Sequence, residues 1–65
     1  MAITPSEIRD IRRRLDLTQA ELAERLHVTR DTIASWEIGR SRPRGPAEIL
    51  LRQLSALAAM EEAKL

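Results

Sequence analysis

Residues 29–44 carry side chains that suit recognition by hydrogen bonds and charge rather than the making or breaking of covalent bonds. The first part of this segment holds Thr29, Arg30, Asp31, Thr32 and Ser35, and the second part holds Arg40, Arg42 and Arg44. Their hydroxyl, carboxylate and guanidinium groups offer hydrogen-bond donors and acceptors side by side. Such a mixture predicts a surface that contacts a polar partner.

Two carboxylates, Glu21 and Glu24, could be interpreted as an acid–base pair. Glu21 is already explained as the third residue of a helix-capping box, and Glu24 as a solvated side chain on the same short helix. His27 is the single histidine and there is no cysteine, so a zinc site would depend on carboxylates alone. We therefore expect neither an enzyme nor a cofactor.

Helix start and stop signals predict four helices. The segments 4–7 (TPSE) and 18–21 (TQAE) are capping boxes, and the first places proline at the first helical position. Thr29 is a suitable N-cap for a third helix, and Pro46 opens a fourth. With a turn at 27–28 and a left-handed cap at Gly39, the expected helices span about 5–15, 19–26, 30–38 and 46–61.

The expected helix 30–38 has few apolar side chains, namely Ile33, Ala34, Trp36 and Ile38. Ile33 and Trp36 are expected to pack inward, which leaves the polar side chains of this helix to point elsewhere. A short helix that is anchored by a few residues and shows mixed donors and acceptors suits insertion into the major groove of DNA.

Chain length and charge limit the alternatives. The 65 residues make one domain, and a chain of this size buries only about 60% of its unfolded surface, so dimerisation is an attractive source of further burial. The net charge is only +1, but residues 40–44 form a local basic strip without an acid. No apolar run approaches the roughly 20 residues of a membrane span and no signal-peptide pattern opens the chain. The absence of cysteine fits a reducing compartment, and a cytoplasmic protein is expected.

The expected helix 46–61 is more apolar than one core-facing stripe requires. One of its faces is expected to close the core against the helices at 5–15 and 30–38. The surplus apolar side chains either broaden the buried face or form a dimer contact, and we favour the dimer because exposed apolar patches usually mark interfaces. The tail 61–65 is expected to fray.

Three segments resemble the helix-turn-helix family of phage repressors and Cro-like (XRE-like) DNA-binding transcriptional regulators. They are LTQAELA at 17–23, LxVT at 26–29 and TIxxWExGR at 32–40. The match covers roughly residues 6–57, and its two helices and turn fit without gaps. The resemblance implies an all-α, compact bundle of four to five helices, in which helix 19–26 and recognition helix 30–38 form the helix-turn-helix.

The resemblance also implies roles for individual residues. Gln19 would sit against the DNA backbone, Thr29 would contact a phosphate, and the positions that reach base edges match Arg30, Asp31 and Ser35, with Thr32 on the flank. Arg40 and Arg42 match basic residues that touch phosphates after the recognition helix, and the strip continues to Arg44. The family often pairs an arginine of the first helix with the glutamate that ends the third, which matches Arg12 and Glu37.

Two positions depart from the family pattern. His27 stands where the family usually has glycine, and histidine adopts a left-handed conformation only at some cost. Asp31 places a negative charge where relatives often carry a neutral side chain. This charge would be unfavourable near phosphates unless the carboxylate accepts from a cytosine amino group or orders Arg30. An equal alternative to a role in DNA binding is that Asp31 only stabilises the N-terminus of its helix.

The sequence thus predicts a sequence-specific regulator that binds double-stranded DNA. We expect a homodimer on an inverted-repeat operator, with half-site centres about 34 Å apart, that represses transcription of a small operon. The alternative is a protein-interaction adaptor or antitoxin-type protein that uses the same scaffold with a partner such as a toxin.

Overall fold

The computed structural model describes residues 3–63, and the side chains of residues 3–61. Its helices are α1 (Pro5–Arg14), α2 (Gln19–Leu26), α3 (Arg30–Glu37) and α4 (Pro46–Ala63), and the described residues form no strand. The predicted all-α class is therefore confirmed. α1 and α3 each end one residue earlier than expected, and α4 continues through part of the tail that was expected to fray. The last two residues of that tail lie outside the described residues.

The predicted capping residues begin the first three helices. Thr4 and Thr18 each accept from the backbone N–H three residues on, while Glu7 and Glu21 accept in return from the backbone N–H groups of these threonines. The Thr29 side chain accepts from the backbone N–H of Thr32. Each interaction satisfies N–H groups that a helix start would otherwise leave unpaired.

The same hydrogen-bond arrangement, a Schellman motif, ends each of the first three helices. At the end of α3, for example, the N–H of Arg40 donates to the carbonyl of Ser35 (2.9 Å) and the N–H of Gly39 to that of Trp36 (3.2 Å). The motif needs one left-handed residue, and these are Asp16 (φ 55°), His27 (φ 57°) and Gly39 (φ 78°). His27 therefore adopts the left-handed conformation at the position where the family usually has glycine. The left-handed conformation of Asp16 was not predicted from the sequence.

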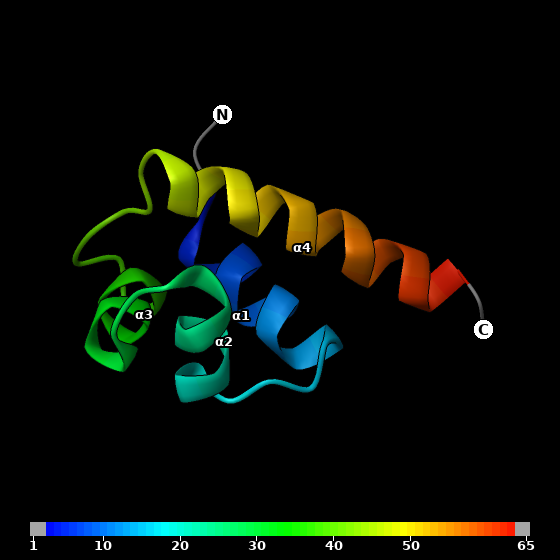
Figure 1. Ribbon diagram of the computed structural model, residues 1–65, viewed down its shortest axis with the longest axis horizontal. Coiled ribbons are helices and arrows are strands. Elements are labelled where there is room, and N and C mark those ends of the chain that lie inside the picture. Colours follow the sequence, from blue (N-terminus) through cyan, green and yellow to red (C-terminus); the bar gives the residue numbers. More distant parts are fainter. Residues whose placement is uncertain (1–2, 64–65) are drawn as a thin grey trace.

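The core lies where α1, α2 and α3 converge beneath α4 (Figure 1). Its fully buried side chains are Ile8, Leu22, Ile33 and Leu51. α4 packs mainly on α1 and α2, which corrects the expectation that α3 would be its second partner. The reason is that the buried face of α3 is already covered by α1 and α2, so α3 lies at one end of the molecule.

The outward side of α4 carries large apolar side chains. Ile49, Leu57 and Met60 are 59%, 42% and 61% exposed, whereas Leu51 and Ala58 face the core. At 100° per residue, Ile49 and Met60 lie nearly on one line along α4, and Leu51 and Ala58 lie opposite. Despite its apolar character, neither α4 nor another helix of the described chain has the length and hydropathy to cross a membrane.

Candidate nucleic-acid interface

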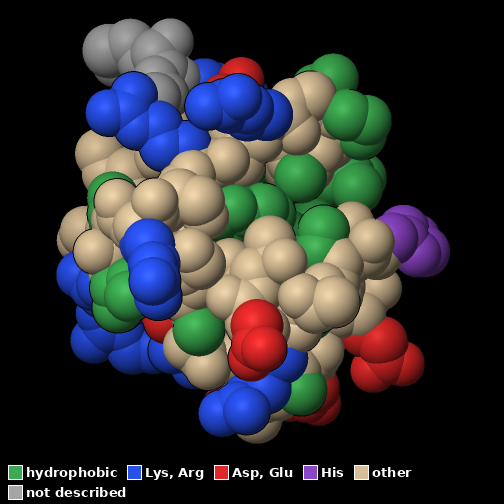
Figure 2. Space-filling view, turned by 90° about the vertical axis from the view of Figure 1, so that its left-hand side faces the viewer, with side chains coloured by type: hydrophobic (Ala, Val, Ile, Leu, Met, Phe, Trp, Pro, Cys, Tyr) green, Lys and Arg blue, Asp and Glu red, His purple; other side chains and the backbone are tan. Residues whose placement is uncertain are grey.

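α3 divides its side chains between two opposite faces. Ile33 and Trp36 are buried in the core, as predicted, while Asp31 and Ser35 lie on the opposite side and are exposed or half-buried. Figure 2 looks onto the end of the molecule that α3 and the following loop form, where several Arg side chains stand out on the surface among a few acids. The outward face of α3 is therefore free for contact with a partner.

Hydroxyl groups occupy both ends of this face. Thr29 and Thr32 lie with their Oγ1 atoms 2.8 Å apart, next to the N-terminus of α3. Near its C-terminus, the Oγ of Ser41 donates to the Oγ of Ser35 (2.9 Å). Because the Ser35 oxygen accepts this bond, its own proton remains available to a partner's acceptor. Ser41 was not anticipated as a neighbour of the candidate site.

Arg30 and Asp31 occupy the first turn of α3 with exposed side chains. Among the described side chains neither forms an ion pair or side-chain hydrogen bond. Asp31 therefore does not hold Arg30 in place. At the N-terminus of a helix, the negative charge of Asp31 is stabilised by the helix dipole, whereas the positive charge of Arg30 is destabilised. No polar contact of the described side chains therefore explains an arginine at this position.

The arginines after α3 point into solvent. Arg40 is the last residue of the Schellman motif that ends α3. The corresponding residues after α1 and α2 are Leu17 and Val28, and both of these side chains pack on the core. Arg40 is exposed instead, so this turn presents a charge where the other two bury an apolar side chain. Arg42 and Arg44 are also exposed, on either side of the buried Pro43.

Glu37 joins three helices and fixes the position of α3. Its carboxylate accepts from Arg12 Nε (2.8 Å) and Nη2 (3.1 Å) of α1 and from Gln19 Nε2 (3.2 Å) of α2. Its backbone carbonyl accepts from Arg9 Nη1. The Arg12–Glu37 pair implied by the resemblance is thus present, while the contacts of Gln19 and Arg9 to Glu37 were not anticipated from the sequence.

The charge on Glu37 is maintained although only 4% of this residue is exposed. Burial by itself would raise the pKa of the carboxyl group, but hydrogen bonds from Arg12 and Gln19 and the charges of Arg12 and Arg9 outweigh burial and leave that pKa lowered. The hydrogen bond to Glu37 likewise raises the pKa of Arg12. The pair is therefore fully ionised near neutral pH.

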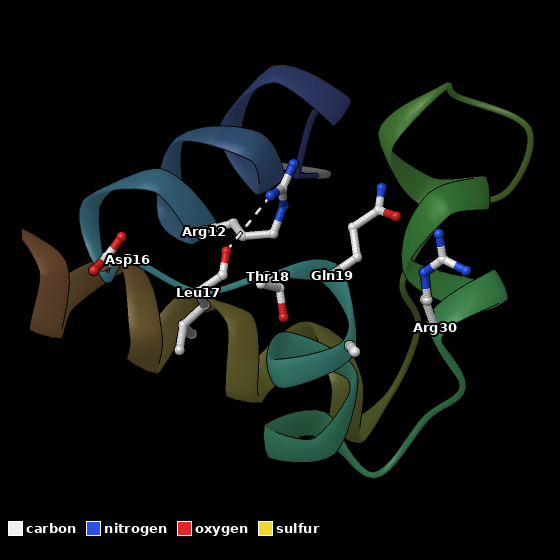
Figure 3. A pocket seen from close by; sticks show the side chains of 7 residues that line it. Arg12, Asp16, Leu17, Thr18, Gln19 and Arg30 are labelled. Atoms are coloured by element: carbon white, nitrogen blue, oxygen red, sulfur yellow. Dashed lines mark hydrogen bonds between the residues drawn. The ribbon is translucent and has the colours of Figure 1, made fainter.

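A hollow of about 400 Å³ lies between the start of α2 and α3. Arg12, Thr18, Gln19 and Arg30 are among the residues that line it, and in Figure 3 Gln19 extends between the arginines of α1 and α3. Free backbone N–H groups at the start of α2 and the guanidinium of Arg30 border the same space. Asp16 also lines the hollow, at the end away from Arg30 (Figure 3). The N–H groups and the guanidinium at the other end favour an anionic group there, for example a phosphate.

Comparison with known proteins agrees with this geometry. The model of the family described as helix-turn-helix matches residues 8–59. The chain is 40% identical to antitoxin HigA-2 of Vibrio cholerae over 50 residues, which cover 77% of this chain and 48% of the relative. It is 58% identical over 36 residues to an uncharacterized HTH-type transcriptional regulator of Methanothermobacter thermautotrophicus, which cover 55% of this chain and 52% of the relative. The chain thus spans about half the length of these curated relatives.

The fold defines the class of helix-turn-helix domains. The chain belongs to the helix-turn-helix family, which confirms the membership that the segments at 17–23, 26–29 and 32–40 predicted.

Proposed function

We propose that this protein is a transcriptional regulator that binds a specific sequence of double-stranded DNA. The observation that carries the proposal is the outward face of α3, whose polar side chains form no ion pair with described residues and are bordered by exposed arginines. α3 would lie in the major groove with its N-terminal turn toward the base edges. Such a regulator would act in the cytoplasm.

The contacts divide into two kinds. Base discrimination is assigned to Arg30, Asp31, Thr32 and Ser35. Positioning through phosphates is assigned to Gln19, Thr29, Arg40, Arg42 and Arg44. Gln19 would act together with the free N–H groups at the start of α2, because its amide is already held by Glu37.

Arg30→Ala is expected to weaken binding to the selected site by about 1–3 kcal/mol and to relax preference at one base pair, because an arginine can bind guanine through both O6 and N7. Arg42→Ala is the matched control, since the same side chain is removed from a phosphate position. It should weaken all sequences alike and lower the salt slope by about one unit. Titration of a panel of duplexes by fluorescence anisotropy at several salt concentrations measures both the base preference and the salt slope of each variant. A uniform loss for Arg30→Ala would place Arg30 on a phosphate instead.

The operator is proposed to be an inverted repeat bound by a homodimer, with the outward face of α4 as the contact between the two copies. Ile49, Leu57 and Met60 supply an apolar strip that a second copy would bury. Ile49→Glu is expected to shift the protein toward monomer in sedimentation velocity across protein concentrations and to weaken binding to the full operator while half-site binding persists. A wild-type protein that stays monomeric on DNA would refute this interface.

The second candidate is a protein-interaction adaptor or antitoxin-type protein, favoured by the similarity to antitoxin HigA-2. Its partner would be a second protein such as a toxin. Selection from a random DNA pool separates the two proposals. Enrichment of a defined, palindromic sequence supports the regulator, and a failure to bind any duplex in gel shifts at low salt supports the adaptor.

A further inference from the structure

Ile38, the C-cap residue of α3, is exposed at the outer side of that helix and is not part of the core. The sequence places it among the few apolar side chains of this helix, yet it is 74% exposed, more than Ile49, Leu57 or Met60. Its backbone N–H still donates to the carbonyl of Ala34 (3.3 Å), so the chain follows the path of the helix as far as this residue, although its φ of −102° departs from the helical value.

The outer stripe of α3 is formed by Asp31 and Ser35 and continues to the C-cap residue Ile38. At 100° per residue these three fall within about 60° of one another, and the buried Ile33 lies on the far side of the helix. Together with Ala34 they have the spacing i, i+3, i+4 and i+7, which places four side chains along one face over about 10 Å. Other recognition helices of three-helix DNA-binding domains contact the major groove with the same spacing.

The surroundings of Ile38 favour nucleic acid over a protein as the group that covers it. Arg40 and Arg42 follow it with exposed guanidinium groups, and Arg30 lies at the other end of the helix. Three of the four large exposed apolar side chains of the described residues, Ile49, Leu57 and Met60, lie instead on α4, where a protein partner could cover them together. In the major groove the single large apolar group is the C5-methyl of thymine.

We propose that Ile38 is a specificity-determining residue that packs against the C5-methyl group of a thymine in the major groove. This inference rests on the proposed DNA binding by α3 and adds an apolar contact to its hydrogen-bonding face. Asp31 and Ser35 would discriminate by donors and acceptors, and Ile38 by the presence of a methyl group.

The experiment uses the duplex that wild-type protein selects from a random pool. Each thymine is replaced in turn by deoxyuridine, which removes only the methyl group, and affinities are measured by fluorescence anisotropy for wild type, Ile38→Val and Ile38→Ala. For wild type, one thymine per half-site is expected at which methyl removal weakens binding about three- to tenfold. Ile38→Ala should weaken binding to the thymine duplex by a similar factor and show no further loss with deoxyuridine, with Ile38→Val in between.

Three results would overturn the inference: a selected half-site without thymine, no sensitivity to any methyl group, or a sensitivity that persists unchanged in Ile38→Ala. Thermal unfolding of the variants verifies the fold, and because Ile38 is exposed, their Tm values should match wild type within a few degrees. Failure of wild type to select any sequence would instead refute the proposed DNA binding itself, so the two failures are distinguishable.

Discussion

Replacing Glu37 by glutamine is expected to lower the free energy of unfolding at pH 7 by about 3 kcal/mol, the lower end of what breaking a buried ion pair costs. The substitution keeps the size of the side chain but removes the negative charge of the carboxylate to which Arg12 and Gln19 donate hydrogen bonds. Arg12 would then remain as a largely buried cation without its carboxylate. The lower end applies because a quarter of the Arg12 side chain is exposed. Urea unfolding followed by circular dichroism measures the difference.

The pH dependence gives this prediction a distinctive signature. The pKa of Glu37 is lower in the folded protein than its ordinary value of 4.5, so the unfolded chain binds more protons as the pH falls below that value. The stability from Glu37 is therefore fully present above about pH 5 and is lost as the pH falls through the folded pKa. The difference between wild type and Glu37→Gln should shrink over the same interval.

Glu24→Gln is the matched control for Glu37→Gln. Glu24 is exposed on α2, so the same substitution there should change the free energy of unfolding by no more than about 0.5 kcal/mol. A Glu37→Gln variant as stable as wild type at pH 7 would contradict the structural importance of this carboxylate. If instead the stability difference did not vary with pH, the ionised state of Glu37 would not be its source.

Leu51→Ala is the second large effect and should lower the free energy of unfolding by about 2–5 kcal/mol. Leu51 is fully buried on the core face of α4, so truncation leaves a cavity where α4 covers α1 and α2. Leu57→Ala is the matched control, since it makes the same change on the same helix at a side chain that is 42% exposed. Denaturation at two protein concentrations separates the loss of core packing, which is independent of concentration, from any loss of dimer contact.

The opposite ranking of these two leucines would show that α4 presents its other face to the core. In that case the apolar strip proposed for dimerisation would be the one containing Leu51, and the assignment of Ile49 and Met60 to a second copy would be wrong.

Local signals in the sequence were sufficient to locate the helices. Thr4, Thr18 and Thr29 each specify a helix start through a hydrogen bond within three residues, and Gly39 specifies an end in the same local way. The Arg12–Glu37 pair joins residues 25 positions apart, and it was predictable only through resemblance to a family.

The remaining features depend on how the helices pack. Helical spacing places Ile38 on a different side from Ile33, but the exposure of Ile38 becomes clear only from the way α3 packs on α1 and α2. Asp16 is similarly hidden, since aspartate favours helix starts and turns alike. Gln19 was assigned to DNA by resemblance, and its contact with Glu37 appears only when α2 and α3 are brought together.

The separation of core and outer faces on α3 has a consequence for how binding preference can change over evolution. α3 is bounded by the Thr29 cap and the Gly39 turn, and its packing depends on Ile33, Trp36 and Glu37. None of these side chains belongs to the outer stripe. Substitutions in that stripe can therefore accumulate at little cost to folding. If the stripe binds DNA as proposed, descendants of one ancestral gene could acquire different operators while keeping the same scaffold.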